Sequence, residues 1–96
     1  MAKFMLLHVG FEKPTPEMMA AWQAWFAETA DVTVENAGFS GGCEISAAGT
    51  TELAWDATCL SGYSVIDVPD RATAEAIAAR NPFVSAIRVY ALREHG

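Results

Sequence analysis

Residues 61–82 read SGYSVIDVPDRATAEAIAARNP and predict a strand, a tight turn and a helix in succession. The first part is a run of aromatic and β-branched side chains that ends at Pro69, which is typical of a β-strand. Asp70 is a typical N-cap, because its carboxylate can accept from the free amides of the next turn. An alanine-rich helix follows and ends at Asn81, because a residue before proline is disfavoured in the α region. This unit buries only one face, so the rest of the chain must cover it.

The elements before this stretch follow from the pattern of apolar residues. Residues 3–9 are apolar on both faces of an extended chain, which predicts a central strand. Thr, Pro and Glu at 15–17 are a typical helix start, with Thr as N-cap and Pro at the first helical position. Apolar residues then recur at three- and four-residue steps, which predicts a helix to about Asn36. Gly38 supplies the residue just past its end.

Two further strands complete the expected chain order, and a short hairpin segment lies between them. Residues 39–46 are expected to be the second strand, residues 50–55 a short return strand of a hairpin, and residues 85–92 the final strand. The order strand–helix–strand–strand–helix–strand predicts an α+β, ferredoxin-like βαββαβ domain. Two helices then cover one face of a four-stranded antiparallel sheet. The other face is also apolar, so we expect a second copy to cover it as a homodimer.

Composition and charge limit the partners. The chain has 96 residues and a net charge of -6, which suits one soluble domain. No Lys or Arg occurs between Pro14 and Asp70. Nucleic acids and anionic membrane surfaces require basic side chains, so we expect neither partner. No apolar run approaches the roughly 20 residues of a membrane span.

The cysteines and the N-terminus indicate the compartment. Cys43 and Cys59 lack CxxC spacing and are expected to be buried, reduced thiols, which is typical of the cytoplasm. The N-terminal apolar run is shorter than the ~7–15 residues of a secretory signal. We therefore expect a cytoplasmic protein.

Several segments together resemble the YCII-related family. They are a KFMLL start, a Thr-Pro-Glu helix, an Ala-Gly-Phe turn into a Gly-Gly strand, GYSVIDV, an alanine-rich helix and Asn-Pro. The resemblance covers most of the chain and rests on order and spacing. It implies the dimeric α+β barrel, whose relatives by fold include small cofactor-independent enzymes.

The chain departs from the family pattern in three places. WDATCLSG stands where many members have Asp-Gly-Pro-Phe, and Arg88 and Tyr90 stand where relatives often have Glu and Arg. Members with suspected activity are associated with a His–Asp pair whose histidine lies in or before the first helix. No histidine occurs between Gly10 and Arg93, so this pair matches no position here.

His8 is the main catalytic candidate. It lies in the middle of a central strand, and imidazole titrates near neutral pH. Asp67 lies in a neighbouring strand, and an adjacent carboxylate would raise the pKa of His8 and make it a general base. As a base, His8 should titrate between about pH 5 and 8. The alternatives are a buried histidine bonded to a backbone carbonyl, or a pair at a dimer interface.

The other candidates are ligand-binding side chains. Four aromatic residues either line a pocket for a flat apolar ligand or belong to the core: Trp22, Trp25, Phe26 and Trp55. Tyr63 and Tyr90 carry hydroxyls suited to a phenol or enol. Arg88 suits a carboxylate ligand or an interface ion pair. Two histidines and scattered carboxylates form no metal-ligand pattern, and no phosphate-binding glycine motif occurs, so no cofactor is expected.

These observations leave two hypotheses. The first is a homodimer with an apolar pocket between the first helix and the sheet, in which His8 catalyses cofactor-free isomerisation, cyclisation or lactone chemistry on a small organic molecule. The second is a dimer that binds a small ligand, or modulates a partner enzyme, without chemistry.

Overall fold

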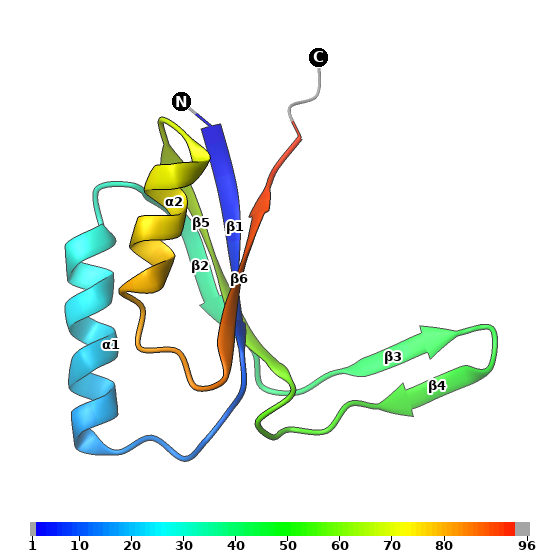
Figure 1. The fold of residues 1–96 in the computed structure, drawn as a ribbon. Coiled ribbons are helices and arrows are strands. Elements are labelled where there is room, and N and C mark those ends of the chain that lie inside the picture. Colours follow the sequence, from blue (N-terminus) through cyan, green and yellow to red (C-terminus); the bar gives the residue numbers. More distant parts are fainter. Residues whose placement is uncertain (1, 94–96) are drawn as a thin grey trace.

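The computed structural model describes residues 2–93 as a sheet layer and a helix layer (Figure 1). The main sheet has the strand order β2-β5-β1-β6, and its neighbouring strands are antiparallel. Both helices cover the same face of it (Figure 1). This confirms the α+β, ferredoxin-like prediction. The elements are β1 (Ala2–Val9), α1 (Pro16–Thr29), β2 (Thr33–Gly38), β3 (Cys43–Ser46), β4 (Gly49–Glu52), β5 (Leu60–Val68), α2 (Arg71–Ala79) and β6 (Ala86–Ala91).

The helix starts form as their sequences predict. Asp70 accepts a hydrogen bond from the backbone N–H of Thr73 at 2.9 Å, and Thr15 accepts one from the N–H of Met18 at 3.1 Å. Each bond satisfies an amide that has no partner inside its helix. The helix α2 ends at Ala79, and Arg80 as its C-cap separates it from the Asn-Pro pair.

The first helix is shorter than predicted. It ends at Thr29 rather than near Asn36, and Thr33–Gly38 form the edge strand β2. The hydroxyl of Thr33 donates to the carbonyl of Thr29 at 2.8 Å, in place of a continuing helix turn. The β-branched residues that follow Thr29 also favour a strand. Gly38 therefore lies in a strand and pairs with Gly62, instead of ending the helix.

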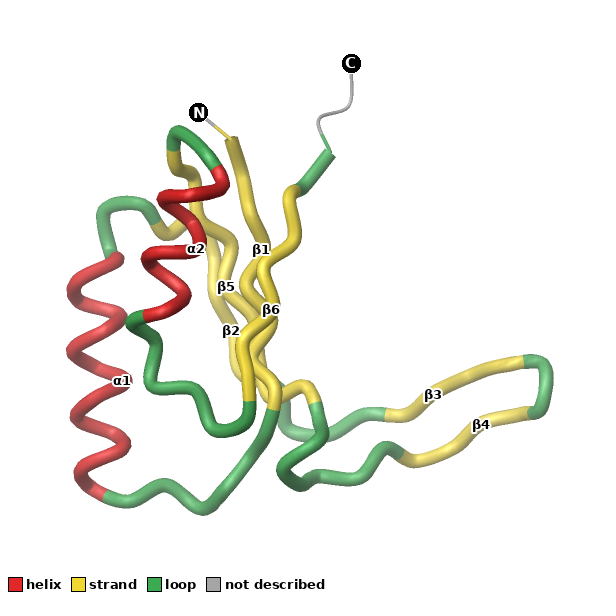
Figure 2. The backbone as a smooth tube through the Cα atoms, viewed as in Figure 1, coloured by secondary structure: helices red, strands yellow, loops and turns green. Residues whose placement is uncertain are grey.

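The prediction of a sheet strand at residues 39–46 is wrong. Residues 43–46 pair instead with Gly49–Glu52, so the expected return strand exists with shifted bounds. Within residues 2–93, this hairpin forms a separate two-stranded sheet. It projects on the side of the main sheet that the helices leave open (Figures 1 and 2). We call residues 43–52 the arm. Cys43 is exposed on it, contrary to the expectation of a buried thiol.

The core lies between the main sheet and the helices. Its buried members come from both layers: Phe4, Leu6, Trp25, Ile66, Val68, Ala74, Ile77 and Ala78. Because side chains alternate along a strand, the intervening residues point to the opposite, open face. No helix in the described chain is both long and apolar enough to cross a bilayer.

The open face has an apolar middle and charged flanks. Met5, Leu7 and Val65 lie on the two central strands. Charged side chains on this face come from all four strands, in the order Glu35 on β2, Asp67 on β5, Lys3 on β1 and Arg88 on β6. The acids therefore occupy one half of the face and the bases the other.

Candidate functional site

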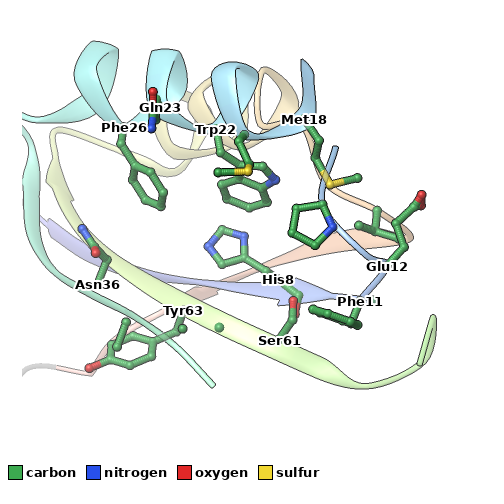
Figure 3. A pocket seen from close by; sticks show the side chains of 17 residues that line it. His8, Phe11, Glu12, Met18, Trp22, Gln23, Phe26, Asn36, Ser61 and Tyr63 are labelled. Carbon is green, nitrogen blue, oxygen red and sulfur yellow. The ribbon is translucent and has the colours of Figure 1, made fainter. Parts of the chain in front are cut away.

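A cavity of about 480 Å³ lies between α1 and the sheet (Figure 3). Met18, Trp22 and Phe26 of α1 form one wall, and His8 of β1 lies across from them. The loop from β1 to α1 contributes Phe11 and other residues at the rim. The spacing of the helix residues places them on one side of α1, because residues three and four apart are neighbours on a helix.

His8 is the buried polar group of this cavity. Its side chain is 6% exposed, and its ring points from β1 toward Trp22 (Figure 3). The two rings meet edge to face, with centroids 5.0 Å apart. Nε2 lies 3.3 Å from the hydroxyl of Ser64, whereas Nδ1 is buried without a partner among the described residues. A buried polar atom without a partner is costly, so a hydrogen bond from a ligand to Nδ1 would relieve that cost.

Burial decides the charge of His8. It lowers the pKa of the imidazole to about 4, because the charged form loses hydration between the helix and the sheet. This value lies below the window of about pH 5 to 8 that we expected. His8 is therefore neutral across that window and offers one nitrogen donor and one acceptor.

The structure does not bring Asp67 to His8. Asp67 lies opposite Lys3 on β1, whereas His8 lies opposite Gly62 near the other end of β5. The two side chains also point to opposite faces, since Asp67 alternates with the buried Ile66. Ser64, which sequence reasoning missed, is the residue of β5 whose hydroxyl lies within hydrogen-bond distance of the His8 ring.

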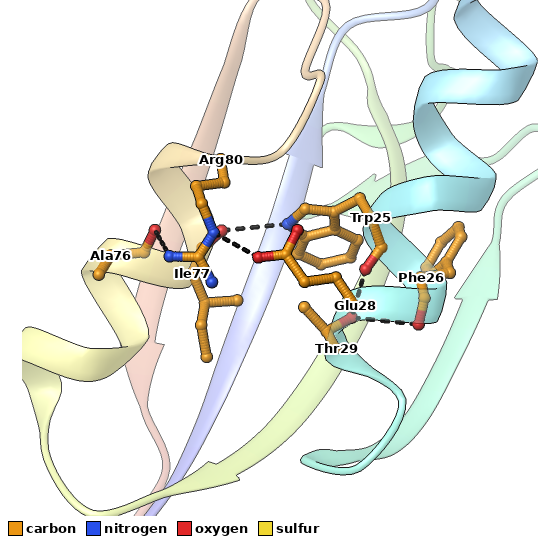
Figure 4. Close-up of polar contacts among 7 residues, drawn as sticks. All are labelled: Trp25, Phe26, Glu28, Thr29, Ala76, Ile77 and Arg80. Carbon is orange, nitrogen blue, oxygen red and sulfur yellow. Dashed lines mark hydrogen bonds and ion pairs between the residues drawn. The ribbon is translucent and has the colours of Figure 1, made fainter.

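The predicted aromatic residues separate into two groups. Trp22 and Phe26 line the cavity, and their rings lie 5.6 Å apart. Trp25 belongs to the core: it is 2% exposed, and its indole N–H donates to the carbonyl of Ile77 at 3.1 Å (Figure 4).

Trp55 lies outside the main cavity. Its ring contacts Phe11 with centroids 5.1 Å apart. It also lines a second cavity of about 340 Å³ at the root of the arm, together with Phe39, Leu53 and Leu60. Phe11 therefore connects the rim of the main cavity with the root of the arm.

The remaining predicted residues face the other side of the sheet. Tyr63 lies at the edge of the cavity, but its side chain points away from the cavity's centre (Figure 3). Its hydroxyl donates to Glu35. Arg88 and Tyr90 pair with Leu7 and Met5 on the open face. These three side chains suit an interface better than the cavity.

The cavity also contains polar residues that the sequence did not single out. Asn36, Gln23 and Glu12 lie on its walls, where they can orient a polar group of a ligand. Among the described residues, no group of three His, Cys, Asp or Glu side chains could hold a metal ion.

Gly62 lines the cavity at the strand position opposite His8 and lies close to the backbone of β2. A Cβ atom built there would lie 2.8 Å from the backbone oxygen of Ala37, which a strand cannot easily move. We expect Gly62→Ala to lower the free energy of unfolding by about 1–3 kcal/mol, the usual cost of overpacking. Urea denaturation of the purified protein measures this value.

Gly38, the cross-strand neighbour of Gly62, provides the matched control. A Cβ atom there meets its first contact only at 4.0 Å, so Gly38→Ala should change the stability by less than about 1 kcal/mol. If Gly62→Ala and Gly38→Ala lower the free energy of unfolding equally, the close approach to the Ala37 oxygen is not what makes Gly62→Ala destabilising.

Fold and cavity together define a small ferredoxin-like α+β domain with an apolar pocket of ligand size. No family model and no curated protein sequence matches the chain, so the YCII resemblance has no support at the family level. The structure is similar to that of 5-chloro-2-hydroxyhydroquinone dehydrochlorinase from Burkholderia phenoliruptrix AC1100, solved in complex with 2,5-dihydroxybenzoquinone. The TM-score is 0.59 at 11% sequence identity, over 98% of this chain and 95% of that one. At 11% identity, this structural similarity supports the ferredoxin-like fold of the chain.

Proposed function

We propose that this protein binds a flat, largely apolar organic molecule in the main cavity, with one polar group of the ligand on Nδ1 of His8. The cavity volume lies within the usual ligand range of roughly 300–1,000 Å³. Trp22 and Phe26 provide aromatic surface for a ring. The observation that carries the proposal is the buried Nδ1 atom, which lacks a partner in the described chain.

The proposed chemistry is cofactor-free proton transfer by His8. A neutral imidazole can take a proton from carbon or oxygen, but its burial disfavours the resulting cation. The cation is tolerated when the ligand becomes an anion beside it, as in the conversion of a ketone to an enolate. Isomerisation and lactone chemistry proceed through such anions, so they suit this site. The dehydrochlorinase of similar fold acts on a small aromatic molecule, which is compatible with this class of ligand.

Binding without chemistry is the alternative function. The low pKa of His8 favours it, because a base with a pKa near 4 abstracts protons weakly. A bound ligand that is recovered unchanged supports this alternative.

Two probe molecules test the pocket. We expect 2-naphthol to bind about tenfold more tightly than naphthalene, because its hydroxyl can pair with His8. His8→Phe should remove this preference and leave the affinity for naphthalene similar, whereas Tyr90→Phe on the open face should keep it. Quenching of tryptophan fluorescence measures both affinities. Equal binding of the two probes to the wild type, or an unchanged preference in His8→Phe, would exclude His8 as the polar contact.

Deuterium exchange separates catalysis from binding. In D₂O, proton transfer by His8 should exchange the ring hydrogen beside the hydroxyl of 2-naphthol, and mass spectrometry of the recovered probe detects it. Exchange at the uncatalysed rate, with binding intact, favours the non-catalytic alternative.

The proposal includes a homodimer formed through the open face. A two-fold axis parallel to the strands lays the β2–β5 half of one copy over the β1–β6 half of the other, which brings Glu35 and Asp67 toward Lys3 and Arg88. An axis across the strands would instead lay acids over acids.

The proposed location is the cytoplasm. Cys43 and Cys59 are both free thiols in the described chain, and Cys43 is exposed on the arm. Free thiols persist in a reducing compartment.

A further inference from the structure

We propose that the arm, residues 43–52, clasps a second copy of this chain and stabilises the dimer. The inference rests on the homodimer that is part of the proposed function. It adds that this hairpin stabilises the dimer. It concerns a surface separate from the cavity.

The arm lacks the contacts that usually stabilise a hairpin. Within residues 2–93, β3 and β4 pair only with each other, and every residue in both strands is exposed. Ile45 is 78% exposed and Leu53, just beyond the arm, is 52% exposed. An isolated two-stranded hairpin is marginally stable in water, so apolar contact with another surface would stabilise this one.

The root of the arm fixes its direction. The N–H of Gly10 donates to the carbonyl of Cys59 at 2.7 Å, and the N–H of Phe11 donates to the carbonyl of Asp56 at 2.8 Å. The ring of Trp55 packs on Phe11. The arm therefore leaves the body at a set angle, on the side of the open face (Figure 1). Any molecule on that face lies beside the arm.

A second copy fits this position better than another partner. The charges of the open face are self-complementary only under the two-fold axis parallel to the strands. With that axis, the two arms leave the same end of the dimer in opposite directions, so each passes along the other copy. Glu44 and Glu52 make the arm acidic, and the loop after β1, which lies at the same end, carries Lys13 next to Glu12.

The arm is long enough for this contact. Eight residues separate Phe39 at its root from Ala47 at its tip, which gives at most roughly 26 Å at about 3.3 Å per residue. Packed sheets lie about 10 Å apart, so the tip passes the partner's sheet and reaches its helix layer. Ile45 and Cys43 share one side of the hairpin, whereas Glu44 and Thr51 lie on the other.

A shortened arm tests the inference directly. The N–H of Leu53 donates to the carbonyl of Gly42 at 2.9 Å, so these two residues lie opposite each other. Replacement of residues 43–52 by Asn-Gly closes the hairpin at this pair with a two-residue turn. Sedimentation equilibrium of the full chain should show a dimer, twice the chain mass of 10.3 kDa. The shortened chain should dimerise with a Kd at least about tenfold higher.

A pair of point variants keeps the test valid if the shortened chain fails to fold. Ile45→Asp and Thr51→Asp each add one negative charge, on opposite sides of the arm. Ile45→Asp should raise the dimer Kd about tenfold, and Thr51→Asp should change it less than about threefold.

The outcomes distinguish this inference from the proposed function. An unchanged Kd after shortening, or equal effects of the two Asp variants, would overturn the clasp and leave the dimer intact. A full chain that stays monomeric at about 100 µM would overturn the clasp together with the proposed dimer. Binding of 2-naphthol is measured separately, so neither result decides the function of the cavity.

Discussion

Acidification from pH 6.5 to pH 4 is expected to lower the free energy of unfolding by about 3 kcal/mol through His8 alone. The pKa of His8 is about 4 in the folded protein and about 6.5 in the unfolded chain. Between these values the unfolded chain binds the extra proton, so stability falls as the pH falls. The contribution of neutral His8 to the free energy of unfolding is fully present well above pH 6.5 and fully lost well below pH 4. Urea denaturation at half-unit pH steps measures the slope.

The variant His8→Gln is the control. Its amide can still contact Ser64 but does not titrate, so the stability should stay nearly constant between pH 6.5 and pH 4. Protonation of two carboxylates, Asp56 and Asp70, also lowers the free energy of unfolding in acid. Hydrogen bonds from Thr58 and Thr73 lower the pKa values of these groups in the folded protein. Their effect begins near pH 5, about one unit above the ordinary carboxyl pKa of 3.8, and occurs in both proteins, so the difference between the two proteins isolates His8. An identical slope in the wild type and in His8→Gln between pH 6.5 and pH 4 would mean that His8 is hydrated in solution.

The parts of the fold predicted correctly depend on local signals. The stretch from 61 to 82 combines a β-branched run, an N-cap and a proline stop, and all three lie within one strand–helix unit. The boundary after Thr29 was missed because the apolar stripe continues through Val32 into β2. A short edge strand and a helix face can produce the same short apolar pattern, so periodicity alone could not separate them.

The candidate site was only partly predictable for a similar reason. The position of His8 in the middle of a central strand made it the main catalytic candidate, and the structure shows the buried histidine that was the alternative. The same alternation assigns Asp67 to the face opposite Ile66 and Val68, and it could have selected Ser64 instead. The loop residues at the rim of the cavity carry no periodic signal, because their positions depend on contacts between distant segments.

Trp25→Ala is expected to have the largest effect of any substitution proposed for this chain, a loss of about 3–5 kcal/mol in the free energy of unfolding. The side chain is 2% exposed and fills the space between α1 and α2 (Figure 4). Its removal leaves a cavity and removes one of the two hydrogen bonds to the carbonyl of Ile77, which keeps the bond from the N–H of Arg80. The total free energy of unfolding of a small domain is about 5–15 kcal/mol, so this loss removes a large share of it. Thermal denaturation by circular dichroism measures it.

Two further variants make the Trp25 prediction specific. Trp25→Phe keeps an aromatic ring but lacks the indole N–H, so we expect a smaller loss of about 1–3 kcal/mol. Trp22→Ala, three residues earlier on the same helix, removes a wall of the cavity instead of a core contact. It should destabilise the protein less than Trp25→Ala but weaken the binding of 2-naphthol, because the aromatic surface for the ring is gone. Equal destabilisation by Trp22→Ala and Trp25→Ala would mean that both indoles belong to one core and that the cavity is closed in solution.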